Sequence, residues 1–148
     1  MYVRKVLCLC KGNTCRSPMM ERMLRHQLEA RGVSDVTVES AGLLKEAEGQ
    51  PMAPESANEL RARGIPTDGH TSRHVASIGN INRFDYVITV GQEEAAAFRE
   101  LYPEYTGLVM VLNEANGGVP NPWRLGDEAY RLCAELIERC IGDVAKAL

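Results

Sequence analysis

The sequence has no long apolar run, no block of basic residues and no cluster of residues typical of a metal site. Its 148 residues contain no stretch of about 20 apolar residues and no apolar signal-peptide core behind Met1. The 17 lysines and arginines are scattered among 20 acidic residues, and the net charge is −3. Because nucleic-acid-binding surfaces are strongly basic, this balance argues against nucleic acid as a partner. We expect a cytoplasmic protein with no membrane or nucleic-acid partner.

The cysteines are too unevenly placed for a disulfide framework. Their number is odd, and they form a group near the start of the chain and a pair near its end: Cys8, Cys10, Cys15, Cys133 and Cys140. Unpaired cysteines of this kind fit a reducing compartment. Neither their spacing nor that of the three histidines matches a zinc site. We therefore expect no metal and no other cofactor.

The pattern of apolar residues predicts one α/β domain covering residues 1–148. The composition, 45% hydrophobic and 25% charged, fits a single domain with a full core. Apolar, β-rich runs alternate with segments of helical periodicity, which favours a parallel sheet with helices on both faces. The predicted fold class is therefore three-layer α/β/α with a four-stranded parallel sheet. The predicted strands are 3–9, 36–40, 84–90 and 108–112, and the predicted helices are 18–31, 55–63, 92–101 and 126–147, with a weak helix at 75–78.

The stretch 8–18, CLCKGNTCRSP, joins the first predicted strand to the first predicted helix. Its centre, Gly12 to Thr14, favours a tight loop. Ser17 followed by Pro18 is typical of a helix N-cap and first helical residue, and Glu21 would then complement the helix dipole from the first turn. The loop is therefore predicted at the carboxyl end of a strand, where open parallel sheets form their ligand crevices.

Cys10 and Arg16 bracket this loop and indicate an anion site. Backbone N–H groups and the helix dipole favour negative charge at a helix N-terminus, on a bound anion and on a deprotonated sulfur alike. Buried cysteines more often pack as small apolar residues, and we interpret Cys8, Cys133 and Cys140 in this way. Cys10 is the candidate nucleophile because of the loop that follows it.

The run 10–18 resembles the signature of the low-molecular-weight protein phosphatases, down to its Gly-Asn and Cys-Arg-Ser-Pro pairs. Three further segments resemble that family in the same order along the chain: Glu39 to Gly42 at the end of the second strand, Gly69 to Arg73 in a His-x-x-Arg connection, and Asn121 to Trp123 in the acid loop. The resemblance covers essentially the whole chain. It implies strand order 2-1-3-4, a phosphorylated protein as substrate, and phosphate or another oxyanion bound in the loop.

The resemblance also implies a role for individual residues. Cys10 would attack phosphorus and form a phosphocysteine that water hydrolyses, and Arg16 would hold the phosphoryl oxygens. Ser17 would donate a hydrogen bond to the sulfur, and Trp123 would form an aromatic wall that makes phosphotyrosine the first choice of substrate. The implied phosphate-binding set is Lys11, Gly12, Asn13, Thr14, Cys15 and Arg16, and the implied supporting residues are Asn13, Ser40 and His70.

Asn121 stands where the family carries the aspartate that protonates the leaving oxygen. An amide cannot release a proton at neutral pH, and general acid catalysis is typically worth about 10²–10⁴-fold. We therefore expect a slow first step on alkyl phosphates. Three explanations stay open: a naturally weak or specialised phosphatase, an engineered Asp-to-Asn change, or proton donation by Asp127, whose position at a helix start instead favours a dipole partner.

Thr14 is a second departure, because many tyrosine-specific members carry an aliphatic residue there. In having threonine at this position, the sequence resembles the bacterial protein-arginine phosphatases of the same family. The small side chain of threonine would admit a phosphoguanidinium group. Solvent also protonates the nitrogen leaving group of a phosphoramidate more readily than the oxygen leaving group of a phosphate ester, so a missing general acid would matter less. Two other classes stay open. One is a small-thiol-dependent arsenate reductase, since no cysteine lies between Cys15 and Cys133 to relay a disulfide; the other is a phosphate-binding module with weak turnover.

Overall fold

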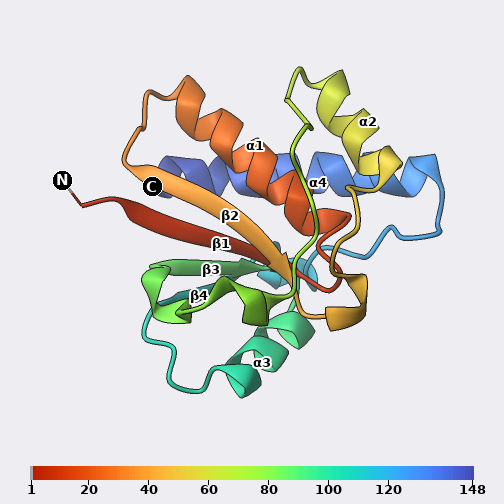
Figure 1. The fold of residues 1–148 in the computed structure, drawn as a ribbon. Helices are drawn as coiled ribbons and strands as arrows, with labels where there is room; N and C mark the ends of the chain where they lie inside the picture. Colours follow the sequence, from red (N-terminus) through yellow and green to blue (C-terminus); the bar gives the residue numbers. More distant parts are fainter. Residues whose placement is uncertain (1) are drawn as a thin grey trace.

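In the computed structural model, which describes residues 2–148, four strands form one parallel sheet (Figure 1). The strand order is β2-β1-β3-β4, so the first strand lies inside the sheet. This confirms the predicted fold class and strand order. The strands are β1 (Arg4–Cys10), β2 (Val36–Gly42), β3 (Tyr86–Thr89) and β4 (Leu108–Val111).

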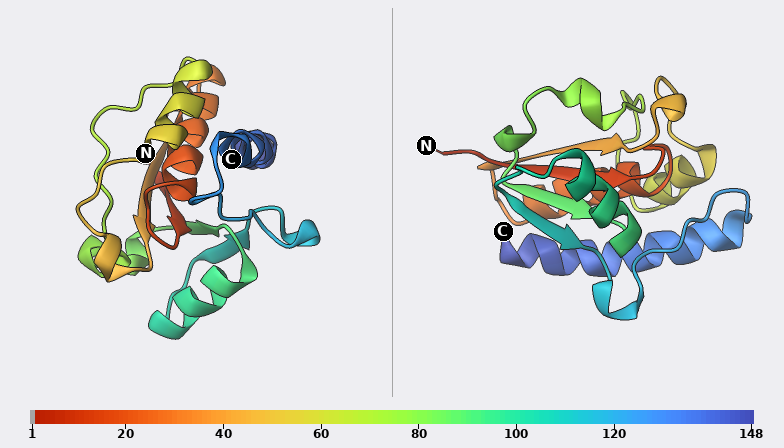
Figure 2. Two further views of the ribbon diagram at one scale, coloured as in Figure 1. Left: turned by 90° about the vertical axis from the view of Figure 1, so that its right-hand side faces the viewer. Right: turned by 90° about the horizontal axis from the view of Figure 1, so that it is seen from below.

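Helices cover both faces of the sheet, as predicted. On one side lie α1 (Arg16–Ala30), α2 (Pro54–Ala62) and α4 (Asp127–Ala147), and on the other lies α3 (Gln92–Leu101) (Figure 2). The connections contain short 3-10 turns at Lys45–Ala47, Val75–Ile78, Ile81–Arg83 and Glu114–Asn116. Within residues 2–148 no helix combines the length and hydropathy that a membrane span requires.

The central strand β1 is buried on both faces, which explains its near-continuous apolar sequence. Val6, Cys8 and Cys10 face the core that contains α1 and α4, whereas Leu7 and Leu9 face the core that contains α3. Each of these side chains is at most 2% exposed. Cys8 therefore packs as a core residue, as predicted. Cys10 ends a strand that cannot shift without disrupting both cores.

The prediction that Ser17 caps the first helix is wrong. α1 begins at Arg16 with Cys15 at its N-cap, so Ser17 lies inside the first turn. Pro18 is tolerated there because the first four N–H groups of a helix have no intrahelical acceptor. Because the Ser17 hydroxyl does not cap the helix, it is available to the sulfur of Cys10, from which its oxygen lies 3.1 Å away.

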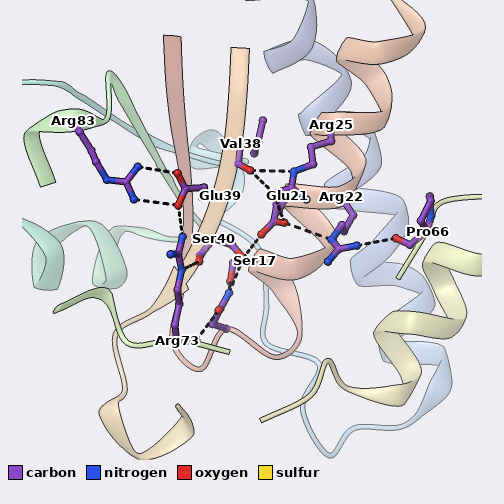
Figure 3. A network of polar contacts seen from close by, with 11 residues as sticks. Ser17, Glu21, Arg22, Arg25, Val38, Glu39, Ser40, Pro66, Arg73 and Arg83 are labelled. Atoms are coloured by element: carbon purple, nitrogen blue, oxygen red, sulfur yellow. Dashed lines mark hydrogen bonds and ion pairs between the residues drawn. The ribbon is translucent and has the colours of Figure 1, made fainter. Parts of the chain in front are cut away.

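Glu21 is not in the first turn either, and its interpretation as a dipole partner is wrong. The first turn of α1, Arg16 to Met19, contains no acidic residue, because the earlier helix start moves Glu21 into the second turn. There its side chain is buried, accepts a hydrogen bond from Ser40 of β2, and pairs with Arg25 (Figure 3). Glu21 thus belongs to the contact between α1 and the sheet.

Glu39, in the middle of β2, forms ion pairs with two arginines from later in the chain. Its carboxylate pairs with Arg73 at 2.6 Å and with Arg83 at 2.8 Å (Figure 3). The hydrogen bond from Arg83 is the largest influence on its pKa and, with that from Arg73, lowers the pKa from 4.5 to about 2 although burial acts in the opposite direction. Arg73 also donates from Nε to the carbonyl oxygen of Ser40 at 3.0 Å. Glu39 therefore fastens the connection around Arg73 to the sheet.

Replacing Glu39 with glutamine should weaken the dependence of stability on acid pH. Because the pKa of this carboxyl is lower in the folded chain, its stabilisation is complete above about pH 4.5 and is lost as the pH falls toward 2. In urea unfolding followed by circular dichroism, Glu39→Gln should be less stable than wild type at neutral pH and lose less further stability on acidification. Glu29→Gln, which removes an exposed carboxylate at the end of α1, is the control. Equal acid losses in wild type and Glu39→Gln would contradict the prediction.

Candidate active site

The segment between β1 and α1 folds back over the sulfur of Cys10. The backbone N–H groups of Asn13 and Ser17 donate to Sγ at 3.3 Å and 3.4 Å, and the hydroxyl oxygen of Ser17 lies at 3.1 Å. The Cys10 side chain itself is buried. Because the loop leads into the N-terminus of α1, the helix dipole adds to these donors. The loop therefore surrounds the sulfur with positive potential.

Asn13 holds this loop in shape. Its backbone has a φ of 58°, in the left-handed region that asparagine adopts more readily than most residues. The side chain is fully buried, and its Nδ2 donates to Oγ of Ser17 at 2.8 Å and to Oγ of Ser40 at 2.9 Å. Its Oδ1 accepts from the backbone N–H of Arg73 at 3.0 Å. One amide thus joins α1, β2 and the connection around Arg73.

His70 contacts the backbone of the same residue. Its Nε2 lies 2.8 Å from the carbonyl oxygen of Asn13. Burial is the largest influence on the pKa of His70 and lowers it from 6.5, although the hydrogen bond to Asn13 acts in the opposite direction. A neutral imidazole with its proton on Nε2 donates to this carbonyl. His70 therefore fixes the peptide group that follows Asn13.

The donors and acceptors around the Asn13 amide define a directed chain of hydrogen bonds. Because Nδ2 donates to both serine oxygens, each hydroxyl keeps its own proton for another acceptor. Ser40 donates to the carboxylate of Glu21. Ser17 has the sulfur of Cys10 at 3.1 Å and, farther away, the carbonyl oxygen of Ala41 at 3.4 Å. The hydrogen bonds thus connect the sulfur to a buried carboxylate, and Ser17, Ser40 and Glu21 of this series can be followed in Figure 3.

Arg16, where the loop enters α1, has a buried donor without a partner in residues 2–148. Its side chain is 5% exposed, and Nη1 donates to the carbonyl oxygen of Val119 at 2.8 Å. Its Nε is buried and has no hydrogen-bond partner among residues 2–148. Buried N–H groups are nearly always paired, and an oxyanion in the loop would supply the acceptor. Val119 was not predicted as part of the site because it contributes a backbone carbonyl, for which its side chain gives no signal.

The loop and the segment before α4 line one cleft of about 790 Å³. Asn121 is exposed, and its Oδ1 accepts from the backbone N–H of Trp123 at 3.2 Å. Trp123 is 55% exposed, with the guanidinium of Arg124 4.1 Å from the centre of its ring. Other residues that line the cleft are Cys10, Lys11, Gly12, Thr14, Cys15, Arg16, Glu46, Glu55 and Tyr130.

The outer edge of the loop is anchored to α2 and α4. The sulfur of Cys15 lies 3.1 Å from the hydroxyl oxygen of Tyr130, and the hydroxyl of Ser56 donates to the carbonyl of Cys15 at 3.2 Å. Burial raises the pKa of Cys15, and burial followed by the contact with Cys15 raises the pKa of Tyr130. Both groups are therefore protonated at neutral pH and form a neutral hydrogen bond. The side chain of Lys11 is not anchored to α2 or α4. It is half exposed, and its Nζ lies 3.9 Å from the carboxylate of Glu93 in α3.

Gly42 allows the loop to lie directly against β2. It is the register partner of Cys10 in the sheet. A Cβ added to Gly42 would lie 2.7 Å from the carbonyl oxygen of Lys11 and 2.9 Å from the carbonyl carbon of Gly12. That Lys11 oxygen accepts from the backbone N–H of Leu44 at 2.8 Å. Only a residue without a side chain permits this approach.

The residues predicted for the site fall into two groups. Those of the loop lie in the segment that folds over the sulfur, and Ser40 and His70 support this segment through hydrogen bonds to Asn13. Asn121 and Trp123 line the same cleft without a hydrogen bond to the loop in the described part of the chain. Glu21 was not predicted as a residue that supports the site. The sequence signal that could have indicated it is a carboxylate among the apolar residues of the first predicted helix. Residues 2–148 contain no group of three or more His, Cys, Asp or Glu side chains that could hold a metal ion.

A cysteine at the end of the first strand, with an arginine-backed loop at the start of a helix, is the architecture of the cysteine-based phosphatases. Residues 5–148 match the model of the family described as low molecular weight phosphotyrosine protein phosphatase, and the chain belongs to this family. The low molecular weight protein-tyrosine-phosphatase Wzb of Salmonella typhimurium is 31% identical over 146 residues, which cover 97% of this chain and 93% of Wzb. The protein is accordingly a phosphoric monoester hydrolase.

Solved structures share the fold over nearly the whole chain. Wzb of Vibrio vulnificus, in complex with benzylphosphonate, is 24% identical with a TM-score of 0.86, covering 98% of this chain and 99% of that one. The arginine phosphatase YwlE, known from Bacillus subtilis, has been solved as a cysteine-to-serine mutant with a phosphorylated active-site serine. That structure is 22% identical with a TM-score of 0.85, covering 97% of this chain and 95% of that one. The fold alone therefore does not decide the substrate.

Gly42→Ala should disrupt oxyanion binding, because the added Cβ must displace the backbone of Lys11 and Gly12. We expect the variant to lose most of the rise in melting temperature that inorganic phosphate produces in the wild type. Hydrolysis of p-nitrophenyl phosphate should fall on the order of 10²-fold, since small displacements of reacting groups are costly. Gly142→Ala is the control, because a Cβ there meets nothing within 4 Å. Undiminished phosphate binding in Gly42→Ala would show that the loop tolerates displacement.

Proposed function

We propose that the protein removes phosphate from phosphotyrosine in proteins through a phosphocysteine intermediate. The observation that carries this proposal is the buried, unpartnered Nε of Arg16, in a residue that lines the same cleft as Cys10. Such a donor calls for an anion, and a phosphoryl group held by the loop would lie beside the sulfur. The name of the matched Wzb, a protein-tyrosine-phosphatase, supports the choice of substrate.

The proposed reaction has two steps. First the sulfur of Cys10 attacks phosphorus in line with the departing oxygen, so that a sulfur–phosphorus bond forms as the phosphorus–oxygen bond breaks. Arg16 and the loop N–H groups hold the equatorial oxygens, where negative charge is concentrated. Ser17, whose hydroxyl contacts the sulfur, stabilises it as attacker and later as leaving group. Water then attacks phosphorus, releases phosphate and restores the thiolate.

Asn121 leaves the departing oxygen without its usual proton donor. Asp127 does not line the cleft and lies in the first turn of α4, which supports its interpretation as a helix-dipole partner. Without an acid, the rate of the first step depends on how basic the leaving group is. A phenolate is a much weaker base than an alkoxide. The amide at position 121 should therefore slow the first step less for phosphotyrosine than for phosphoserine.

Trp123 also supports an aryl substrate. The residue is more than half exposed and lines the cleft that contains Cys10. An exposed aromatic face beside a reactive group is a surface on which another ring packs. Because Arg124 covers one face of the indole, the ring of a phosphotyrosine would pack on the other face.

Protein-arginine phosphatase is the second candidate. Thr14 lines the cleft with Cys10, and the carboxylates of Glu46 and Glu55 line it too. Carboxylates are the natural partners of a guanidinium group. A nitrogen leaving group is also protonated readily by solvent, which would make Asn121 a smaller handicap. The fold neighbour YwlE is itself described as an arginine phosphatase.

Asn121→Asp should raise the phosphatase rate at mildly acid pH, where more of the new carboxyl group is protonated. The increase should be about tenfold or more, and it should not exceed the roughly 10⁴-fold that is the upper end of what general acid catalysis contributes. It should be larger for a phosphotyrosine peptide than for p-nitrophenyl phosphate, whose leaving group needs little protonation. Asn116→Asp adds the same charge at an exposed site on a neighbouring turn and is the control. An unchanged rate in Asn121→Asp would place the acid elsewhere.

The substrate is tested with p-nitrophenyl phosphate and with two matched peptides that carry phosphotyrosine or phosphoarginine at one position. We expect a burst of nitrophenolate followed by steady turnover, and a higher kcat/KM for phosphotyrosine. Cys10→Ser should abolish the burst. A preference for phosphoarginine would favour the second candidate, and absence of turnover would favour a phosphate-binding module. Arsenate-dependent oxidation of a small thiol would instead identify an arsenate reductase.

A further inference from the structure

A second groove adjoins the catalytic cleft on the side of α3. It has a volume of about 390 Å³, and Lys11 and Leu44 line both hollows. From α3 it is lined by Glu93, Ala97 and Glu100, whose spacing places them on one face of the helix. We call this hollow the α3 groove. Because the two hollows share lining residues, a chain bound in the catalytic cleft can extend directly into the α3 groove.

The α3 groove is apolar and acidic at the same time. Leu44 and Leu101 line it and are 44% and 55% exposed. Three carboxylates, from Glu93, Glu94 and Glu100, face the single ammonium group of Lys11 among the lining residues. At 3.9 Å and half exposed, Lys11 forms only a weak ion pair with Glu93. The groove therefore carries an excess of negative charge beside exposed leucines.

Glu94 provides independent evidence for a ligand in this groove. It is 7% exposed, and within residues 2–148 its carboxylate has no hydrogen bond or ion pair. The carboxylate oxygens themselves are not fully buried, so solvent reaches them. The N-terminus of α3 favours a negative charge at this position, but the dipole supplies no donor to the carboxylate oxygens. Glu94 is thus an unpaired carboxylate on a largely buried residue that lines the groove, and it is available to a cation that enters.

We propose that the α3 groove binds a lysine or arginine side chain of the protein substrate, a few residues from the phosphorylated residue. The inference rests on the proposed function, because it requires a phosphorylated chain in the neighbouring cleft. The apolar stem of the basic residue would lie against Leu44 and Leu101, with its charged end at Glu94 and Glu100. The enzyme would thereby distinguish phosphorylated sequences by the charge and hydrophobicity of their flanks.

The test uses a phosphotyrosine peptide in which lysine or glutamate replaces each flanking residue in turn. At positions on one side of the phosphotyrosine, lysine should raise kcat/KM over glutamate by about three- to tenfold. The difference should shrink at high salt, because the groove is open to solvent. Glu94→Gln and Glu100→Gln should each reduce it and leave the rate on p-nitrophenyl phosphate unchanged, since that substrate has no flanking chain. Glu29→Gln, on α1, should keep the full preference.

Binding of the same peptides to Cys10→Ser, followed by fluorescence anisotropy, measures the preference without turnover. No lysine preference at any position, or one that Glu94→Gln and Glu100→Gln leave intact, would overturn the α3 groove as a substrate site. Glu100 is exposed, so Glu100→Gln decides the matter even if Glu94→Gln fails to fold. If wild type lacks activity on p-nitrophenyl phosphate while the lysine preference in binding persists, the proposed function fails and the docking site stands.

Discussion

The side-chain amide of Asn13 is the contact on which the loop between β1 and α1 depends. A left-handed backbone at a residue other than glycine costs about 1–3 kcal/mol and persists only where the surroundings hold it. Here two donated hydrogen bonds and one accepted hydrogen bond tie the amide to Ser17, Ser40 and Arg73. Each partner comes from a different part of the chain. The loop therefore acquires its shape only when β2, α1 and the connection around Arg73 are all in place.

The same loop is positioned by close packing as well as by hydrogen bonds. β1 is fixed between two cores, so its last residue, Cys10, has a defined position. Gly42 then lets the backbone of Lys11 and Gly12 approach β2 more closely than any side chain would permit. An anion entering the loop meets donors that are already oriented. Such preorganisation avoids reorganisation during the reaction, which is where much of the rate enhancement of enzymes originates.

The sequence predicts the parts of this structure that depend on local signals. Alternating apolar runs and helical periodicity were enough for the α/β class, and the Cys10 to Arg16 loop could be recognised from residue types alone. The start of α1 was misplaced because Ser17 and Pro18 imitate a cap, whereas the hydroxyl contacts a sulfur in the preceding strand. Contacts that require the folded chain could not be predicted. Val119 contributes a carbonyl, and Gly42 matters only through its register with Cys10.

The two sides of the catalytic cleft are built from separate parts of the chain, and this bears on how such an enzyme can evolve. The loop around Cys10 is fastened to β2, α2 and Tyr130 of α4, whereas Asn121 contacts the backbone of its own turn. Under the proposed function, a lineage could therefore exchange the residue that meets the leaving group and keep the whole loop that holds phosphate. Asn121 beside an intact loop would then be an example of this independence, in which one scaffold serves leaving groups of different basicity with the same nucleophile.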